Sequence, residues 1–480
     1  MAFTARSDRP GSLSGVSEIQ DLTTPTTTSR RGFLAAGAGL ATAATVGPML
    51  WVPPASAGVR PQGVHVTYGA DARRRMAVSW STPASVKKPV LELGLGRDFG
   101  TRIAADSRSS KDVGTVYHHV DLTRLRPDTT YRYRLSHAGA TAYEGSFRTA
   151  PSEPKAFRFA AFGDMGVNEA AAAHVALIAQ QKPAFAFVVG DLCYADSSGG
   201  TGLGSADTQD FQVWDQWLQQ IQPSAAKVPW MTTVGNHEME AGNGELGYAG
   251  YLDRFSLPTN GVKDAPVTYS FVHGNVGFIA LDGNDASTEI NRNNGYVGAT
   301  LDAWLVGRLT EMRERSDIDF IVAGFHNCMY CTNLVHGSDG GTRSRWEPIF
   351  DQFEVDLVVN GHNHCYERTH IMRGGVAVQE APDGAVVDSS TGTTYLTAGG
   401  AGQAAYPTGG LPLSYVTVEG GLRIPEATTW SAVTYEDHSI AFLDVTPRDK
   451  QGIATMKLTA RSTDGTVIDT VTMKRQRRSA

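Results

Sequence analysis

Cysteine, long apolar runs and an excess of positive charge are all scarce in this chain of 480 residues. Its four cysteines allow at most two disulfides. Beyond the N-terminus, no segment approaches the roughly 18 consecutive apolar residues of a membrane-spanning helix. The net charge of −7 and the pI near 6.0 argue against a broad basic surface, so we expect no nucleic-acid partner. An anionic substrate must then be attracted by local positive charge, which bound metal ions can provide.

The first 57 residues have the pattern of an export signal. Ser29–Leu34 reads as a twin-arginine motif, and a short apolar stretch rich in Gly and Ala follows at Ala35–Leu50. Ala55–Ala57 fits a cleavage site, so we expect residues 1–57 to be a twin-arginine signal peptide that is removed. The alternative, an uncleaved anchor, is disfavoured by the short stretch and by Pro48. We therefore expect a secreted or extracytoplasmic protein without stable membrane association; nothing in the sequence indicates an oligomeric state.

Residues 58–150 alternate apolar and polar side chains with a period of two. The segments Val64–Tyr68, Met76–Trp80 and Thr130–Leu135 show this pattern, and turn residues separate them. Half of each strand would then face a core, which predicts a small antiparallel β-sandwich. The segment Leu122–Tyr131 resembles the corner of a fibronectin type III module. We expect an all-β fibronectin type III-like domain over 58–150.

From Ala156 the pattern changes to alternating strands and helices, which predicts a second domain over 155–475 of α/β class. We expect strands at 157–162, 185–189, 230–234, 320–323 and 357–359, a hairpin at 269–272 and 276–281, and helices at 168–181, 209–220, 301–315 and 346–353. Such alternation builds sheets with helices on their outer faces, and ligands collect at the carboxyl ends of the strands. The strand-rich segment 394–474 is expected to complete a second sheet.

Five short motifs follow strand-like runs and together supply seven side chains that can bind metal. The motifs are Gly163-Asp164-Met165-Gly166, Gly190-Asp191-Leu192-Cys193-Tyr194, Gly235-Asn236-His237-Glu238, His326 after Ile321–Phe325, and Gly361-His362-Asn363-His364. Any one of them is a weak signal, because a lone Asp164 before a helix is more often a cap than a ligand. Together they mix carboxylate, phenol, amide and imidazole, and they predict a two-metal hydrolase.

The residue types suit two unlike metal ions. A carboxylate can bridge two cations, and Asp191 is the natural candidate. A ferric ion favours hard anionic oxygens, as in Asp164 and a tyrosinate from Tyr194, whereas a divalent ion accepts the neutral Asn236 and His326. A metal-bound hydroxide would attack phosphorus in line while the ions stabilise the developing charge.

Two further histidines are expected at the reaction site. His237 and His336 are candidates to give a proton to the leaving group, because imidazolium is available at mildly acidic pH. For His237 the alternative is that it only orients Asn236 beside it. For His336 the alternative is a solvated loop residue.

The motifs resemble those of the purple acid phosphatases of the larger, plant-like type, within the calcineurin-like metallophosphoesterase superfamily. The tyrosine in Gly190–Tyr194 separates this family from other metallophosphoesterases, and the resemblance extends to Gly399–Gly402. It implies a four-layer α-β-β-α sandwich and a secreted acid phosphatase that hydrolyses small phosphate monoesters. The site residues that it implies fall into four groups: Asp164, Tyr194 and His364 on Fe(III); Asn236, His326 and His362 on Fe, Zn or Mn; Asp191 shared by both ions; and Asn236, His237 and His336 in contact with substrate.

Two other functions fit part of the pattern. A phosphodiesterase or nucleotide-hydrolysing enzyme could use the same scaffold. A non-enzymatic surface binding protein could use the fibronectin-like domain and keep a relic metal site, although the intact ligand set argues against it.

The remaining motifs have structural interpretations. Four cysteines lie in or beside the metal motifs: Cys193, Cys328, Cys331 and Cys365. Export makes one or two disulfides among them plausible, and the sequence does not decide whether they form. A zinc site at Cys328–Cys331 would lack a second ligand pair. Tyr366, Glu367 and Arg368 are expected to form a hydrogen-bonded cluster. Arg343 and Arg345 are expected in surface salt bridges, and Trp214, Trp217 and Trp304 in packing contacts.

Overall fold

A computed structural model describes residues 59–96, 98–109, 114–138, 142–196, 210–408 and 413–476. The expected signal peptide at 1–57 lies outside the described residues. Of the helices in these ranges, none combines the length and apolar character that a membrane crossing requires.

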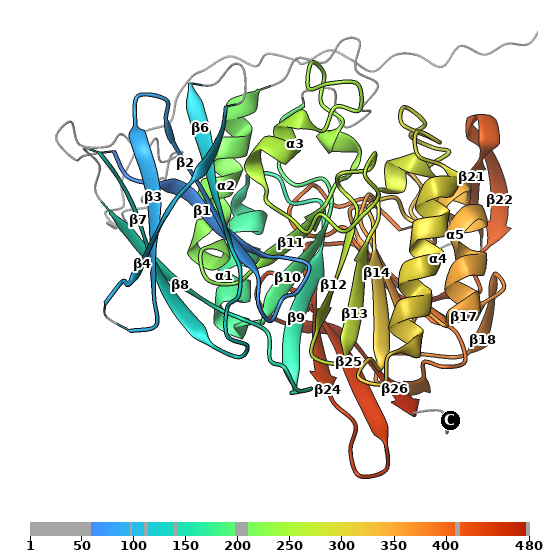
Figure 1. Ribbon diagram of the computed structural model, residues 1–480. Coiled ribbons are helices and arrows are strands. Elements are labelled where there is room, and N and C mark those ends of the chain that lie inside the picture. The colour runs from blue at the N-terminus through green and yellow to red at the C-terminus, as the bar shows by residue number, and fades with distance from the viewer. Residues whose placement is uncertain are drawn as a thin grey trace, which may run out of the picture. The chain divides into compact units, whose positions relative to one another are not determined.

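Two four-stranded antiparallel sheets form the N-terminal part of the described chain (Figure 1). One sheet consists, in spatial order, of β1 (Gln62–Tyr68), β2 (Met76–Pro83), β6 (Thr115–Leu122) and β5 (Asp106–Ser109). The other consists of β4 (Thr101–Ala104), β3 (Lys87–Gly94), β7 (Thr130–Ala138) and β8 (Tyr143–Arg148). In β7, Tyr131, Tyr133 and Leu135 are buried, while Arg132 and Arg134 point outward to Glu144. This alternation is the predicted two-residue period.

Two larger sheets follow. The first consists, in spatial order, of β11 (Trp230–Thr233), β10 (Phe185–Val189), β9 (Phe157–Phe162), β24 (Ser439–Thr446), β25 (Ile453–Ser462), β26 (Val467–Gln476) and β19 (Ala385–Asp388). The second consists of β12 (Tyr269–His273), β13 (Val276–Ala280), β14 (Phe320–Gly324), β16 (Leu357–Asn360), β20 (Thr393–Ala398), β17 (Tyr366–Arg373) and β18 (Val376–Gln379), with β23 (Ser431–Tyr435) paired to β17. A small third sheet joins β15 (Ser338–Asp339), β21 (Leu413–Val418) and β22 (Leu422–Ala427).

The helices of the described residues are short to medium in length. They are α1 (Glu169–Gln181), α2 (Phe211–Ala225), α3 (Ala249–Arg254), α4 (Ala299–Glu314) and α5 (Gly340–Gln352), with single 3-10 turns at Asn236–Glu238, Gly283–Asp285 and Glu419–Gly421. In Figure 1, α4 and α5 lie together on one side of the second sheet.

Alternate side chains of β9 show how the layers are ordered. Phe159 and Ala161 belong to a core that also contains Phe278 of the second sheet, so this face lies between the two sheets. Ala160 and Phe162 belong to a different core, which includes residues of α1 and α2. A third core joins the outer face of β13, β14 and β16 to α4 and α5. The result is the expected four-layer α-β-β-α sandwich. With both faces of each sheet covered, the central strands are continuous apolar runs.

The prediction for the C-terminal segment was only partly right. β20 joins the second sheet as expected, but β24, β25 and β26 extend the first sheet, with β24 antiparallel to β9. The alternating pattern of a strand shows which of its faces are apolar but not which sheet edge it will pair with.

Helix α5 begins at Gly340, six residues before the predicted start at 346. Asp339 caps it, because its Oδ1 accepts hydrogen bonds from the backbone N–H groups of Gly341 and Thr342 at 2.9 and 3.1 Å. Two glycines in the first turn, with low helix propensity, hid this start. The hydrogen bonds accepted by Asp339 stabilise the start of the helix despite the low helix propensity of these glycines.

One buried histidine should make the stability of the fold sensitive to acid. His273 is 3% exposed, and its ring lies 4.4 Å from that of Phe157, with Tyr68 and Phe185 also adjacent. Burial lowers the pKa of His273 to about 3. Below about pH 6.5 the unfolded chain therefore binds a proton that the folded protein does not, and the free energy of unfolding falls by about 2 kcal/mol by about pH 5.

Replacement of His273 with Phe should remove this dependence. We expect the free energy of unfolding of H273F, relative to the parent, to rise by about 2 kcal/mol between about pH 7.5 and 5, measured by urea unfolding at both pH values. A difference between the two proteins that does not change with pH would contradict the assignment.

Candidate metal centre

All five motifs lie at one edge of the sandwich. β9, β10 and β11 are parallel to one another, as are β13, β14, β16 and β20. Each motif follows the carboxyl end of one of these strands: 163–166 after β9, 190–194 after β10, 235–238 after β11, His326 after β14, and 361–364 after β16. Parallel strands place their carboxyl ends together, so seven side chains from distant segments meet.

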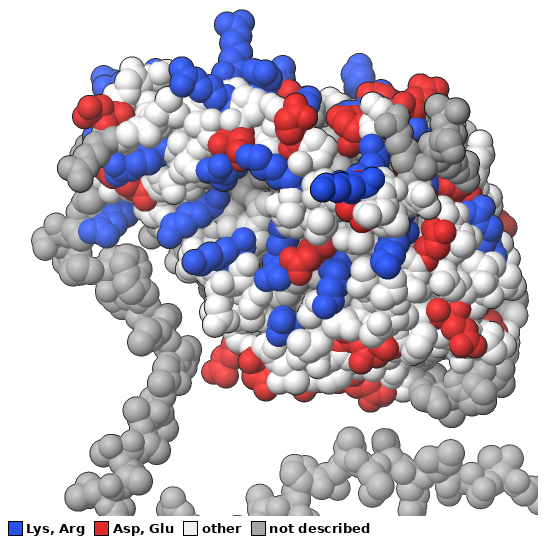
Figure 2. All heavy atoms as spheres, turned by 90° about the horizontal axis from the view of Figure 1, so that it is seen from below, with Lys and Arg blue, Asp and Glu red and all other residues white. Residues whose placement is uncertain are grey.

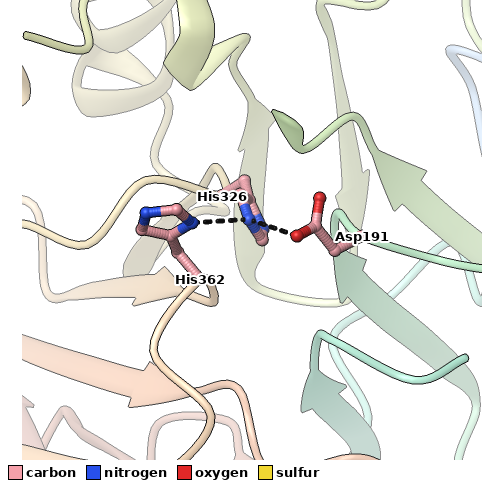
Figure 3. A group of neighbouring side chains, drawn as sticks. All are labelled: Asp191, His326 and His362. Carbon is pink, nitrogen blue, oxygen red and sulfur yellow. Dashed lines mark hydrogen bonds and ion pairs between the residues drawn. The ribbon is translucent and has the colours of Figure 1, made fainter. Parts of the chain in front are cut away.

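Asp191, His326 and His362 form the first group of donor atoms (Figure 3). The Nε2 atom of His326 lies 3.0 Å from Oδ2 of Asp191 and 3.3 Å from Nδ1 of His362. Asn236 joins them, with its Oδ1 3.1 Å from the same Nε2. One ligand atom from each of Asp191, His326 and His362 lies within 4.8 Å of the other two, and all three residues are buried. This spacing suits one cation.

Asp164, Tyr194 and His364 form the second group. The hydroxyl of Tyr194 lies 3.2 Å from Oδ1 of Asp164 and 3.1 Å from Nε2 of His364. Nε2 of His364 is also 3.6 Å from Oδ1 of Asp164. The two groups adjoin, because the same carboxylate oxygen of Asp164 is 4.0 Å from Nε2 of His326.

The backbone at these positions is strained. Nine non-glycine residues of the described chain have a positive φ, and four of them are in the two groups: Asp164 (62°), Asp191 (49°), Tyr194 (57°) and His362 (69°). Each such conformation costs on the order of 1 kcal/mol and persists only where the surroundings impose it. Strain concentrated in one cluster indicates that the fold holds these side chains for function rather than stability.

Close backbone packing explains the glycines of two motifs. A Cβ on Gly235 would lie 2.1 Å from Oδ1 of Asp191, and one on Gly190 would lie 2.6 Å from the backbone N of Gly235. Only glycine lets the two loops approach this closely.

We therefore expect Gly235→Ala to lower the catalytic rate by at least about 100-fold, because it displaces Asp191 by a large fraction of an ångström. Gly235 has an ordinary φ of −112°, so the added methyl acts through space alone. Gly307→Ala is the control: its Cβ would meet no atom within 4 Å in α4, and it should retain activity. Equal kcat values of both variants in a steady-state assay of phosphate-ester hydrolysis would contradict the packing argument.

The carboxylate of Glu238, which the sequence did not identify as important, supports two of the loops. Glu238 accepts hydrogen bonds from the backbone N–H groups of Asp191, Leu192 and Gly235 at 2.9, 2.9 and 2.7 Å. Burial, with the nearby Asp191 charge, raises the pKa of Glu238 to about 8. Its place in the motif beside His237 was the available signal.

His237 lies against both groups. Its backbone N–H donates to Oδ1 of Asp191 at 2.9 Å, and its ring centroid lies 4.0 Å from that of Tyr194, with the two rings tilted by 55°. Its Nδ1 contacts the carboxylate of Asp196, the second residue that sequence reasoning missed. The Nε2 atom then faces Asp191 at 3.8 Å. The imidazole is thus oriented by a carboxylate of its own and is not simply a neighbour of Asn236.

His336 also reaches this edge. Its ring centroid lies 4.1 Å from that of His362, and its side chain is 24% exposed. Its Nδ1 is 2.8 Å from Oε1 of Glu289, a residue in a loop without any motif. Burial alone would raise the pKa of Glu289, but the two histidines outweigh it and lower the pKa to about 2. Glu289 is therefore an ionised carboxylate beside the two groups.

The charges of the cluster fit the binding of cations. Within the described chain, the ion-pair partners of Asp164 and Asp191 are all histidines, with no Lys or Arg among them. Burial lowers the pKa of His362 to about 4 and that of His364 to about 3, so both rings are neutral at physiological pH, the form that ligates metal. Burial acts against the charge on His326, but Asp191 and Asp164 raise its pKa to about 10. A cation would replace that proton.

Loops, rather than a helix cap or a strand, position Asp164, His362 and His364. The cap of α1 is Asn168, whose Oδ1 accepts from the N–H of Ala171 at 2.9 Å, and not Asp164. His362 and His364 do not share a strand; they lie in the tight loop between β16 and β17. Both reach the cluster because the positive φ of His362 turns the chain there.

The sequence left the pairing of the cysteines open, and the described residues contain no disulfide. All four are buried free thiols, and Cys193 lies in a different core from the other three. The sulfur atoms of Cys331 and Cys365 lie 3.7 Å apart. That distance is a van der Waals contact, far longer than the roughly 2.05 Å of a disulfide.

The other structural residues lie mostly as expected. Tyr366, Glu367 and Arg368 are buried and hydrogen-bonded, and Trp214 and Trp217 are fully buried. Arg343 and Arg345 do form salt bridges, to Glu426 and to Asp285 and Asp302, but these are largely buried instead of lying on the surface. Both guanidinium groups are fully engaged there, because each also donates to backbone carbonyls.

A cavity of about 380 Å³ lies away from this edge. Its lining includes Asp319, just before β14, and Glu354, just before β16, so it lies at the edge opposite the metal-ligand cluster. Its guanidinium groups are each paired with a carboxylate: Arg313 and Arg475 with Asp356, Arg315 with Asp317, and Arg448 with Asp319. The underside in Figure 2 likewise shows Lys and Arg standing among Asp and Glu. We assign no ligand to this cavity.

Comparison with known proteins gives consistent matches. Residues 61–149 match the family described as purple acid phosphatase, N-terminal domain, and residues 157–366 match the calcineurin-like phosphoesterases. An uncharacterized protein of Mycobacterium tuberculosis is 32% identical over 94% of this chain and 97% of its own. A phosphoenolpyruvate phosphatase of Allium cepa is 28% identical over 71% of this chain and 70% of its own. A purple acid phosphatase from yellow lupin seeds has the same fold, with a TM-score of 0.69 at 21% identity over 87% of this chain and 75% of its own.

Proposed function

Because this chain belongs to the purple acid phosphatase family of the calcineurin-like phosphoesterases, we propose that it is an acid phosphatase that hydrolyses small phosphate monoesters at a centre of two metal ions. The observation that carries this proposal is the convergence of two adjoining donor groups around His326 and Tyr194, from loops of both sheets. The phosphatase name of the Allium cepa relative agrees with it.

The donor types support the assignment of the ions. Asp164, Tyr194 and His364 offer two oxygens and one nitrogen, a set suited to Fe(III), and burial raises the pKa of Tyr194, so that a strong cation is needed to hold it as tyrosinate. Asn236, His326 and His362 would hold Fe, Zn or Mn, with Asp191 shared. The bound ions would supply Lewis-acid charge that activates water for in-line attack and offsets the charge of the phosphate.

The chain's own residues provide orientation and protons. Asn236 and His237 lie on one loop beside the shared Asp191, where they can contact the phosphate oxygens. Asp196 orients His237, and Glu289 orients His336. We propose that one of these two histidine side chains gives a proton to the leaving alkoxide.

The test compares ester classes. The mature protein, loaded with Fe(III) and then with Zn or Mn, should release phosphate from p-nitrophenyl phosphate at mildly acidic pH at least about tenfold faster than it cleaves bis(p-nitrophenyl) phosphate. The reverse preference would assign a phosphodiesterase, and inactivity of fully loaded, folded protein towards both esters would overturn an enzymatic role.

Two further experiments test the metals and the export route, the first on the metal-loaded protein and the second in cells. A visible absorption band that disappears in Tyr194→Phe would assign the tyrosinate–iron pair, and a colourless active enzyme that holds only zinc or manganese would refute it. For export through the twin-arginine route, replacement of Arg30 and Arg31 by Lys should retain the protein inside the cell. Secretion of the double variant at the parent level would exclude that route.

A further inference from the structure

The carboxylate of Glu289 joins a proposed metal ligand to a proposed substrate contact. Its Oε2 lies 3.2 Å from Nε2 of His362, and its Oε1 lies 2.8 Å from Nδ1 of His336. Both contacts are within hydrogen-bond distance, so each oxygen of the carboxylate serves one histidine. The side chain of Glu289 is 11% exposed.

The contact with His362 determines which ring nitrogen can bind a cation. If Nε2 donates its hydrogen to Glu289, the lone pair is on Nδ1. That Nδ1 lies 3.3 Å from Nε2 of His326, within the first donor group. Without an acceptor at Nε2, a neutral imidazole could carry its hydrogen on Nδ1 instead and would then present a donor where a ligand is needed.

The contact with His336 leaves its second nitrogen free to meet substrate. Nδ1 is engaged by Glu289, and Nε2 has no hydrogen-bond partner in the described part of the chain. Because the ring is partly exposed and lies beside that of His362, Nε2 is accessible at the edge of the cluster.

The loop that carries Glu289 is held firmly. The buried Asp339, which caps α5, accepts hydrogen bonds from the hydroxyl of Ser287 at 2.5 Å and the N–H of Thr288 at 3.2 Å. The hydroxyl of Thr288 in turn donates to the carbonyl of Thr417 in β21 at 2.8 Å. The carboxylate of Glu289 is therefore fixed from the side of α5, independently of both histidines.

We propose that Glu289 is a positioning residue that fixes the ligating tautomer of His362 and, with its other oxygen, holds His336 towards the substrate. The proposal rests on the proposed two-metal phosphatase function. It makes Glu289 a link between metal retention and substrate binding, two properties that a purely structural carboxylate would not move together.

The experiment measures metal retention first. Parent, Glu289→Ala and Glu289→Gln proteins are loaded with Zn²⁺, dialysed against a chelator that buffers free Zn²⁺, and analysed for bound metal. Loss of a carboxylate that orients a ligating histidine typically weakens metal binding about 10- to 100-fold, and we expect E289A to show this loss. E289Q should fall between the two, because one amide group can accept from only one of the two histidines. Glu347→Ala is the control: this carboxylate is also buried, bonds Tyr330 at 2.6 Å, and should leave Zn²⁺ retention unchanged.

A His336→Ala background separates the two contacts. In that background Glu289→Ala should still weaken Zn²⁺ retention, whereas its effect on KM for p-nitrophenyl phosphate should disappear. Unchanged Zn²⁺ affinity in folded E289A, or equal loss in E347A, would overturn the proposal. If the parent binds Zn²⁺ but hydrolyses no phosphate ester, the proposed function fails, while weaker Zn²⁺ binding by E289A would still support the positioning of His362.

Discussion

Replacement of Asp191 with Ala should lower phosphate release by about 1,000-fold or more, since a lost metal ion removes several kcal/mol of transition-state stabilisation. Asp191 is 2% exposed, and its Oδ2 lies 3.0 Å from Nε2 of His326 in the first donor group. It is the carboxylate that we propose the two ions share. Its loss would leave two cations close together without a shared anion, so the variant should also bind less metal.

The measurement is kcat/KM on p-nitrophenyl phosphate together with metal content per chain. Asp444→Ala in β24 is the control, because that side chain is 41% exposed and only pairs with Arg158 at the surface. D444A should keep the parent activity and metal. A folded D191A that retains two metals and full activity would remove the basis of the proposed centre.

The largest effect on stability is expected at Asp469. This fully buried carboxylate in β26 accepts from Nε and Nη2 of Arg368 at 2.6 and 3.0 Å and from the hydroxyl of Tyr366 at 2.5 Å. Arg368 and Tyr366 belong to β17, so the bonds cross from the first sheet to the second. Asp469→Ala would leave the Arg368 guanidinium buried without its counter-charge, and it should reduce the free energy of unfolding by about 3–5 kcal/mol.

Urea unfolding of D469A, of the single variants Arg368→Met and Asp469→Leu, and of the double variant R368M/D469L tests this. Arg368→Met combined with Asp469→Leu removes both charges and should be less destabilised than D469A alone, because no unpaired ion remains. If the double variant were as unstable as the sum of the single variants, packing rather than charge would explain the loss.

The sequence was most informative where chemistry and local pattern coincide. Asp164, Asp191 and His362 follow strands that were predicted to within a residue. Parallel pairing of β9 and β10 brings Asp164 and Asp191 together, and the packing of the two sheets adds His362 from β16. The Tyr366–Arg368 cluster was also recognised, although its partner Asp469, a hundred residues away, was not. Short-range patterns do not encode such long-range pairs.

The residues that sequence reasoning missed lie on loops that only the tertiary fold places at the site. Glu289 belongs to the segment between β13 and α4 and has no motif around it; its position depends on Asp339 at the start of another helix. Asp196 follows the Gly190–Tyr194 motif by two residues, and only the turn of that loop brings it to His237. Likewise, the pairing of β24 with β9 was not predictable, because both edges of the first sheet could accept a strand.

The division of the proposed ligands between the two sheets has a mechanical consequence. Asp164, Asp191, Tyr194 and Asn236 come from loops of the first sheet, and His326, His362 and His364 from loops of the second. A cation bound by both sets of ligands would cross-link the two sheets. The thermal stability of the enzyme should therefore increase with the supply of transition metal during growth. Cells starved of metal would release protein of the same sequence with a lower melting temperature.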